Sequence, residues 1–281
     1  LCVFSARKNA EAKRRHSMTQ ASPVTFIYSH DIFCIMDSHS ETIIKAIKQA
    51  GIFVRENQFK IKDISFKEGK EIVTEIDKEA EKLIKNALKK TYPDYNYYGE
   101  EEGLENNKSD FTFYIDPLDG TGRYVSQTDW YSITIALLKN NEPFASAILI
   151  PNLNELYYAE KGKGAFLNGE KISVSDSSEI VKEKISTSSK TNLKSEGYIS
   201  VKSIGFDACL VAKGELDGTI KIYKSDRRPV ETPAVYLLIK EAGGKMTDFN
   251  GDNWTLDTKN IVLSNGKIHN NLIEISKGLA E

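Results

Sequence analysis

The sequence predicts a layered α+β fold with sheets lying between helices, and three features of its pattern indicate this arrangement. Two amphipathic helical segments come first, a series of short apolar or alternating segments with turn residues between them follows, and the last third alternates between helical and strand-like segments. The 281 residues suffice to bury a substantial core, and no apolar run approaches the roughly 18–20 residues of a membrane span. The formal net charge of −2 argues against a general nucleic-acid-binding protein, which needs a clear basic excess.

The N-terminal segment is expected to lie outside this fold. The first 36 residues carry five basic and two acidic side chains, whereas the rest of the chain carries 33 basic and 38 acidic ones. Because Met36 directly precedes an amphipathic pattern, we expect residues 1–35 to be a non-native or disordered extension; the alternative is a basic transit peptide. Residues 36–281 are expected to form a single domain, with an N-terminal α+β half over 36–175 and a C-terminal α/β half over 176–281.

Cysteine content favours a reducing location. Outside the N-terminal segment the chain has a single cysteine, Cys209, so neither a disulfide framework nor a cysteine-based zinc site is available there. We therefore expect a cytoplasmic protein.

Two helices open the predicted domain. The first is expected over Glu41–Phe59, with Ser38 or Ser40 as its N-cap. The second begins near Thr74, where a capping-box-like start is present, and it ends before Pro93. The expected buried stripes are Ile43, Ile44, Ile47, Ile52 and Val54 on the first helix, and Ala80, Leu83, Ile84, Ala87 and Leu88 on the second.

Strand-like segments follow the helices. A short β-rich run, Phe111–Ile115, is expected to end abruptly at Asp116-Pro117, and consecutive hairpins follow up to about Ser175. The polar stretch Ser175–Lys194 is interpreted as surface. The hairpin strands are expected at Ser132–Lys139, Ala145–Ile150, Glu155–Ala159 and Ala165–Phe166. The later elements are expected at Gly205–Lys213 (helix), Thr219–Tyr223 (strand), Thr232–Ala242 (helix), near Lys245–Asp248 and Ile261–Leu263 (strands), and from about Ile268 (helix).

Acidic residues gather at the end of the strand-like run Phe111–Ile115. Asp116 and Asp119 leave the strand through a proline-fixed turn, so both carboxylates and the carbonyl of Leu118 can converge on one point. Such oxygen-only ligation suits Mg²⁺ or Mn²⁺ rather than zinc. Gly120 and Thr121 follow at once and offer backbone N–H groups to an anion. Singly, these dipeptides are ordinary turn formers, but together they favour metal-assisted phosphoryl chemistry.

Five segments carry a resemblance to a known superfamily, and they occur in the family's order: Ile72–Asp77, Gly99–Glu101, Ile115–Thr121, Gly162–Gly169 and Glu241–Gly244. The chain resembles the lithium-sensitive, magnesium-dependent phosphatases, namely inositol monophosphatases, fructose-1,6-bisphosphatases and 3′-phosphoadenosine-5′-phosphate phosphatases. This resemblance implies the family's α/β/α/β/α sandwich, two or three bound Mg²⁺ ions (with Mn²⁺ as an alternative), inhibition by Li⁺, a small phosphorylated substrate and a homodimer. The charge balance and the lack of a long apolar run favour no nucleic-acid or membrane partner.

The resemblance also implies which residues bind the metal ions. Glu100, Asp116, the carbonyl of Leu118 and Asp119 would be ligands, with Asp116 bridging two ions. Family members usually have an aspartate just before the penultimate long helix, where this chain has Glu231. Glutamate keeps the charge but adds a methylene, about 1.5 Å of reach, which matters for a small octahedral Mg²⁺ site. We expect Glu231 to be a ligand; the alternative is a weakened or lost second metal site.

Catalytic and phosphate-binding roles follow from the same resemblance. Thr121 and Asp77 would lie beside the attacking water, and Glu100 would help to activate that water through a bound metal ion. The backbone N–H groups of Gly120 and Thr121 would hold the phosphate.

The substrate-binding half departs further from the family. The family's Gly-Ser-Ala-Ala run is replaced here by Lys202–Gly205. Asp207 aligns with the position where the family has an acidic or amide residue that contacts the substrate. Inositol monophosphatases have an acidic residue near the inositol hydroxyls, where this chain has Lys221, and Arg227 and Arg228 follow. Basic residues here would suit a second phosphate on the substrate, although a solvated basic loop is an equal alternative.

These observations predict a Mg²⁺-dependent phosphomonoesterase acting on inositol-1-phosphate, fructose-1,6-bisphosphate or both, similar to archaeal-type dual-specificity enzymes. One alternative is a 3′(2′),5′-bisphosphate nucleotidase with the same metal ions. The other is a catalytically impaired relative that serves as a binding or regulatory protein.

Overall fold

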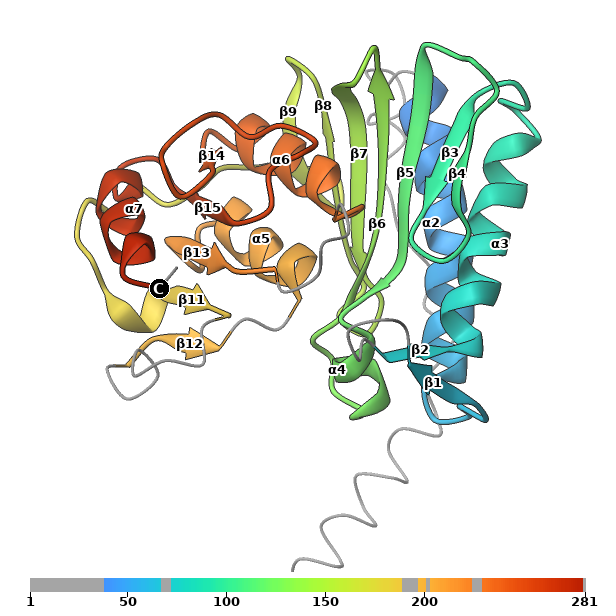
Figure 1. The fold of residues 1–281 in the computed structure, drawn as a ribbon, viewed down its shortest axis with the longest axis horizontal. Coiled ribbons are helices and arrows are strands. Elements are labelled where there is room, and N and C mark those ends of the chain that lie inside the picture. Colours follow the sequence, from blue (N-terminus) through green and yellow to red (C-terminus); the bar gives the residue numbers. More distant parts are fainter. Residues whose placement is uncertain (1–37, 67–71, 189–196, 201–202, 224–228, 280–281) are drawn as a thin grey trace, which may run out of the picture.

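The predicted layering of helices and sheets is confirmed by a computed structural model, which describes residues 38–66, 72–188, 197–200, 203–223 and 229–279. Helices α2 (Ser38–Asn57) and α3 (Glu75–Lys89) form an outer layer beside an eight-stranded sheet (Figure 1). Helices α5 (Ile204–Ala212) and α6 (Thr232–Glu241) lie between this sheet and a five-stranded one, and α7 (His269–Lys277) lies on the far side. The expected extension over 1–35 lies outside the described residues. None of the described helices is both long and apolar enough to cross a membrane.

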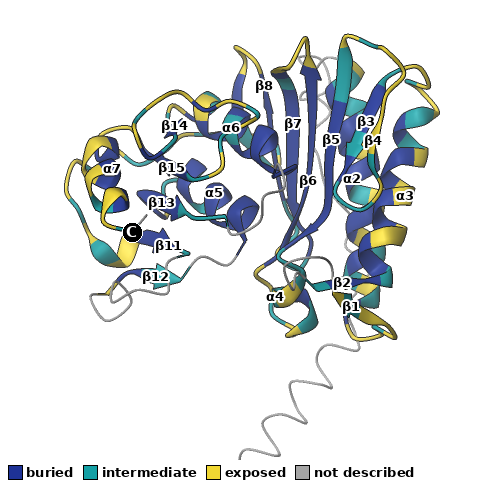
Figure 2. Cartoon of the chain, viewed as in Figure 1, coloured by how far each residue is buried: buried dark blue, intermediate teal, exposed yellow. Residues whose placement is uncertain are grey.

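The outer helices turn one face to the sheet and the other to solvent (Figure 2). Most of the predicted stripe residues are buried, but Ile52 is 42 % exposed and Leu83 is 39 % exposed, so both predictions were wrong. On α3 the buried face is instead shared by polar side chains, with Asp77, Glu81 and Lys85 all lying within it. Their spacing of four residues places them one helical turn apart on one side of the helix.

The start of α3 is fixed by a capping box, as the sequence predicts. The side chain of Thr74 accepts a hydrogen bond from the backbone N–H of Ile76, and the backbone N–H of Thr74 donates to Asp77 Oδ2 at 2.8 Å. These bonds satisfy backbone groups that a helix start leaves without intrahelical partners. Asp77 is thereby held at a defined point of the first turn.

The large sheet runs in the order β10-β9-β8-β7-β6-β5-β3-β4, and β3 and β5 form its one parallel pair. Its strands are β3 (Asn96–Gly99), β4 (Gly103–Glu105), β5 (Phe111–Asp119), β6 (Ser132–Lys139), β7 (Glu142–Ile150), β8 (Glu155–Glu160), β9 (Gly164–Leu167) and β10 (Glu170–Ile172). The prediction that the central strand ends at Ile115 was wrong, because β5 continues to Asp119 with a register shift after Asp116. This irregularity re-aims the side chains at the strand's end.

The small sheet runs in the order β12-β11-β13-β15-β14. Its strands are β11 (Ile185–Thr187), β12 (Ile199–Ser200), β13 (Gly218–Lys221), β14 (Lys245–Thr247) and β15 (Ile261–Ser264). The interpretation of Ser175–Lys194 as surface was wrong for β11, which is fully buried and pairs in parallel with β13. Its polar residues tolerate burial because they find partners; the hydroxyls of Ser186 and Thr219 lie 2.8 Å apart.

Two of the family-like segments, Gly162–Gly169 and Glu241–Gly244, lie far apart in the sequence but are in contact in the fold. The carboxylate of Glu241, at the end of α6, accepts hydrogen bonds from the backbone N–H groups of Gly162 (2.8 Å) and Gly164 (2.9 Å). Gly164 has φ of +97°, a conformation that favours glycine. The β8–β9 turn is therefore tied to the middle helical layer.

Candidate active site

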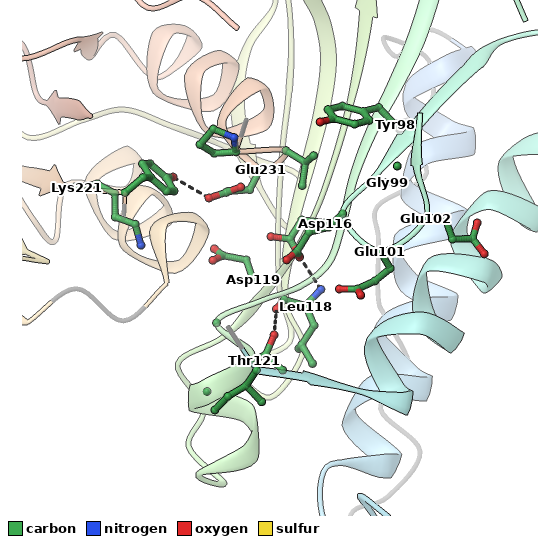
Figure 3. A pocket seen from close by; sticks show the side chains of 18 residues that line it. Tyr98, Gly99, Glu101, Glu102, Asp116, Leu118, Asp119, Thr121, Lys221 and Glu231 are labelled. Carbon is green, nitrogen blue, oxygen red and sulfur yellow. Dashed lines mark hydrogen bonds between the residues drawn. The ribbon is translucent and has the colours of Figure 1, made fainter. Parts of the chain in front are cut away.

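A cavity of 720 Å³ opens where the end of β5 meets the turn after β3, the short helix α4 (Thr121–Val125) and the start of α6 (Figure 3). Its lining contains six acidic side chains and one lysine: Glu100, Glu101, Glu102, Asp116, Asp119, Glu231 and Lys221. The apolar and aromatic part of the lining includes Ile72 and Val230 as well as Tyr98 and Tyr223. A site with this charge imbalance attracts cations.

The end of β5 presents two buried carboxylates. Asp116 is 3 % exposed, and its Oδ1 accepts a hydrogen bond from the backbone N–H of Leu118 at 2.9 Å. Asp119 is 8 % exposed, and its Oδ2 accepts hydrogen bonds from the hydroxyl of Ser132 (3.1 Å) and from the backbone N–H of Gly205 (2.7 Å). One oxygen of each carboxylate is therefore anchored by the protein.

Ser203 and Gly205, from the segment that departs from the family, still support the site, whereas Lys202 lies outside the described residues. The hydroxyl of Ser203 caps α5 by accepting from the backbone N–H of Phe206 at 3.1 Å, and it lies 3.3 Å from the hydroxyl of Ser132. A Cβ at Gly205 would come within 2.4 Å of Ser132 Oγ and 2.9 Å of Asp119 Oδ2. The glycine is thus required for this close approach.

Thr121 connects the turn at the end of β5 to α3. Its hydroxyl donates to Asp77 Oδ1 at 2.9 Å and lies 3.1 Å from the carbonyl oxygen of Leu118. Gly120 precedes α4 with φ of +94°, and a Cβ there would lie 2.9 Å from the Cβ of Ser203. The residues that open α4, Thr121 and Gly122, line the cavity, and the N–H groups at the start of a helix lack partners in the preceding turn. The N–H of Arg123 already donates to the carbonyl of Gly120 at 2.7 Å.

Glu231 enters the cavity from the N-cap position of α6. It is 8 % exposed, and its Oε1 accepts a hydrogen bond from the hydroxyl of Tyr223 at 2.7 Å. The ammonium group of Lys221 lies 5.0 Å from the centre of the Tyr223 ring. Figure 3 shows Lys221 and Glu231 on the same side of the cavity, facing Asp116 and Asp119.

Burial and mutual repulsion raise the pKa values of these acids. The pKa of Asp116 lies well above its ordinary value, first because of burial and then because of the charges of Glu100, Asp119 and Glu231. Burial also raises the pKa of Asp119, against the effect of Lys221. Burial, followed by the charge of Asp119, raises the pKa of Glu231 to about 7. The site is therefore strained in its fully ionised form unless a cation compensates it.

The donor chemistry fits a hard divalent cation. The buried carboxylates and the carbonyl of Leu118 supply oxygen ligands, and only one lysine offsets the acids among the described lining residues. Among the residues that the structure describes, no three aspartate, glutamate, histidine or cysteine side chains are already gathered around one point as in a filled site. The assignment of individual ligands stays a prediction.

The metal-free protein is expected to lose stability as the pH rises. An acid whose pKa is raised on folding binds more protons in the folded state than in the unfolded state. Below pH 4.5 Glu231 is protonated in both states and costs no stability. As the pH rises from 4.5 to about 7 the unfolded chain ionises first, so stability falls and is lowest above pH 7. Its shift corresponds to up to about 3 kcal/mol in the free energy of unfolding. Urea denaturation in EDTA between pH 5 and 8 should show this decline, and saturating Mg²⁺ should reverse it because cation binding favours ionised carboxylates. If the stability of Glu231→Gln declines with pH as steeply as that of the unmodified chain, the pH dependence comes from another group.

The structure brings most of the predicted site residues together. Those that line the cavity are Glu100, Asp116, Leu118, Asp119, Gly120, Thr121, Lys221 and Glu231. Asp77 joins them through its hydrogen bond with Thr121. Asp207 does not: it is buried on α5, 2 % exposed, and is not part of the lining, so its expected substrate contact has no support. Arg227 and Arg228 lie outside the described residues.

Other supporting residues escaped sequence analysis. Tyr223 was expected only as the end of a strand, and Ser132 only as the start of one, yet each is hydrogen bonded to an acid of the site. Glu81 and Lys85 were not expected to matter, although both are buried beside the turn that carries Glu100. The available signal was their spacing of four and eight residues from Asp77 on a helix face that should otherwise be apolar.

Comparison with known proteins shows the family of this chain. A family model described as the inositol monophosphatase family matches residues 36–280. A fructose-1,6-bisphosphatase/inositol-1-monophosphatase of Thermotoga maritima is 32 % identical over 249 residues, covering 85 % of this chain and 95 % of that one. A Nus factor SuhB of Xylella fastidiosa is 32 % identical over 227 residues, covering 74 % and 81 %. The solved IMPase of Thermotoga maritima superposes with a TM-score of 0.79 at 30 % identity, covering 87 % of this chain and 98 % of that one. The resemblance inferred from the motifs is therefore confirmed, and the chain belongs to the inositol monophosphatase family.

Proposed function

We propose that this chain is a Mg²⁺-dependent phosphomonoesterase that hydrolyses a small sugar or polyol phosphate, with inositol-1-phosphate, fructose-1,6-bisphosphate or both as its substrates. The observation that carries the proposal is the buried group of Asp116, Asp119 and Glu231 beside the first turn of α4. Buried acids that repel one another would bind divalent cations, and the neighbouring N–H groups can hold a phosphate. The similarity to the fructose-1,6-bisphosphatase/inositol-1-monophosphatase of Thermotoga maritima supports the same substrates.

Five oxygen donors would hold the metal ions: the carboxylates of Glu100, Asp116, Asp119 and Glu231 and the carbonyl of Leu118. When bound, Mg²⁺ would lower the pKa of the attacking water and neutralise charge on the phosphoryl group. Mn²⁺ is expected to substitute and Li⁺ to inhibit. Because Glu231 is hydrogen bonded to Tyr223, its longer side chain has a fixed position from which to act as a ligand.

The protein's own groups orient the phosphate and the water. Backbone N–H groups of Gly120 and Thr121 would bind phosphate oxygens. Because the hydroxyl of Thr121 donates its proton to Asp77, its oxygen can accept a hydrogen bond from the attacking water. A proton lost by the water would then pass through Thr121 Oγ1 to Asp77, whose pKa is raised by burial. No covalent enzyme nucleophile is needed.

The experiment that tests the proposal is phosphate release from inositol-1-phosphate, fructose-1,6-bisphosphate and 3′-phosphoadenosine-5′-phosphate, each with Mg²⁺ and with EDTA. Turnover of one or both of the first two, abolished by EDTA, is expected. Turnover confined to the nucleotide would replace this proposal with the bisphosphate nucleotidase. If the chain turns over none of them and Glu231→Asp creates activity, it is instead an impaired relative with a binding or regulatory role.

Lys221 is expected to select substrates that carry a second phosphate. It is the one cation among the described residues that line the cavity, and a charge-assisted contact contributes about 1.5–3 kcal/mol. Lys221→Met should therefore raise the KM for fructose-1,6-bisphosphate at least tenfold, with little change in the KM for inositol-1-phosphate. The matched control is Lys240→Met, because Lys240 also packs over a tyrosine ring, at 5.4 Å, but lies exposed on α6. Equal effects on both substrates would contradict this role.

Two finer expectations accompany the proposal. A cytoplasmic location is supported by Cys209 being the only cysteine after residue 36. A homodimer is supported by the family resemblance alone. Neither enters the mechanism above.

A further inference from the structure

A buried ion pair, formed by Glu81 and Lys85, lies beside the turn that carries Glu100. The carboxylate of Glu81, which is 0 % exposed, accepts hydrogen bonds from two consecutive backbone N–H groups of this turn, those of Glu101 (2.8 Å) and Glu102 (3.1 Å). The ammonium group of Lys85 lies 2.8 Å from Glu81 Oε1 and 2.9 Å from Glu102 Oε2. The pair therefore holds the turn through both its backbone and a side chain.

The turn is shaped to receive this carboxylate. A Cβ at Gly99 would lie 2.0 Å from Glu81 Oε1, so only glycine lets the turn come this close. On the opposite side, the backbone N–H of Glu100 donates to the carbonyl of Ile115 on β5 at 3.0 Å. Glu100 is thus held between the carboxylate of α3 and the strand that carries Asp116.

The same helix face positions the other half of the site. Asp77, one turn before Glu81, is fixed by the capping box and hydrogen bonded to Thr121. Helix α3 therefore sets the distance between the groups that orient the water and the turn that carries a metal ligand. Burying an ion pair costs desolvation, and replacing such a pair by apolar residues often leaves stability unchanged or higher, so stability alone does not explain this pair.

We propose that Glu81, supported by Lys85, is a positioning residue that fixes the Glu100 turn in its metal-binding place and thereby sets the affinity of the site for its divalent cation. This inference rests on the proposed function for the identity of the cation. It assigns no contact between Glu81 and substrate or metal. Its consequence is that loss of the carboxylate weakens cation binding more than it slows the reaction at saturating cation.

The first variant is Glu81→Gln, which cannot accept from both N–H groups because one carboxylate oxygen becomes an amide donor. Two readouts are needed: Mn²⁺ binding to the full chain, measured from the electron paramagnetic resonance signal of free Mn²⁺, and phosphate release against Mg²⁺ concentration. We expect at least a tenfold weaker Mn²⁺ affinity and a tenfold higher Mg²⁺ requirement, with kcat at saturating Mg²⁺ reduced less than threefold.

The matched control is Glu241→Gln. Glu241 also accepts two backbone N–H groups of a tight turn, but it lies at the opposite end of α6 from Glu231, about 15 Å away along the helix. The Glu241→Gln variant should have a lower melting temperature than the unmodified chain but the same Mn²⁺ affinity. An equal loss of affinity in both variants would show a general effect of destabilisation and would overturn the inference.

The double variant Glu81→Gln/Lys85→Met keeps the test valid if Glu81→Gln folds poorly, because it also removes the buried lysine that has lost one of its two carboxylate partners. We expect it to regain melting temperature while its Mn²⁺ affinity stays at least tenfold weaker than that of the unmodified chain. Unchanged Mn²⁺ affinity in the double variant would overturn the inference. Since Mn²⁺ binding is measured without substrate, the test remains decisive even if the chain hydrolyses none of the proposed substrates.

Discussion

Replacing Asp116 by asparagine is expected to abolish phosphatase activity and, at the same time, to stabilise the metal-free protein. The activity should fall at least about 10³-fold, since Asp116 would be a metal ligand and an amide oxygen is a weaker ligand for Mg²⁺ than a carboxylate. Stability should rise because the carboxylate is buried among like charges, which raise its pKa well above the ordinary value. Asparagine can still accept the hydrogen bond from the backbone N–H of Leu118.

The two effects are measured separately. Phosphate release at saturating Mg²⁺ reports the activity, and melting at pH 8 in EDTA reports the stability. A gain on the order of 1 kcal/mol would raise the melting temperature by roughly 2–4 °C in a domain of this size. Asp110→Asn is the control, because Asp110 precedes the same strand but is exposed. If Asp116→Asn melts at a lower temperature than the unmodified chain in EDTA, Asp116 is not under charge strain and the cation site is wrongly assigned.

The candidate site residues at the end of β5 were predictable because their chemistry is local. Asp116, Leu118, Asp119, Gly120 and Thr121 lie within six consecutive positions, so the strand and its turn bring them together whatever the rest of the chain does. The helical and strand patterns likewise predicted the layers, since each depends on spacing within one segment. The family resemblance then supplied roles that spacing alone leaves open.

The supporting residues were not predictable, because each acts across a long sequence separation. Gly205 reaches Asp119 across 86 positions, and that contact depends on how α5 docks against the sheet. The strand β11 was hidden because two of its three buried residues, Ser186 and Thr187, are polar, and the hydroxyl of Ser186 finds its partner on β13. Glu81 and Lys85 look like an exposed helical ion pair until the Gly99–Glu102 turn is placed beside them. Nonlocal pairing of polar groups leaves little trace in periodicity.

Replacing Asp77 by asparagine should lower kcat by about 10²–10⁴-fold while leaving KM within threefold, because Asp77 is proposed to accept a proton only as the reaction proceeds. Asp77 also closes the capping box of α3, and asparagine can accept only one of the two sets of hydrogen bonds that the carboxylate now accepts from Thr74 and Thr121. A fall in kcat therefore has two explanations, lost proton transfer and a damaged helix start.

Two further variants separate these explanations. Thr74→Ala removes the capping side chain without touching Thr121 and should cost about 1 kcal/mol of stability, with kcat within threefold of the unmodified chain. Thr121→Val keeps the cap but removes the hydroxyl between the water and Asp77, so it should lower kcat as far as Asp77→Asn does, whereas Thr121→Ser should retain most activity. The double variant Asp77→Asn/Thr121→Val should be no slower than either single one, because both act at the same step. If the two losses multiply, Thr121 and Asp77 act independently, and the proposed proton path through the hydroxyl is wrong.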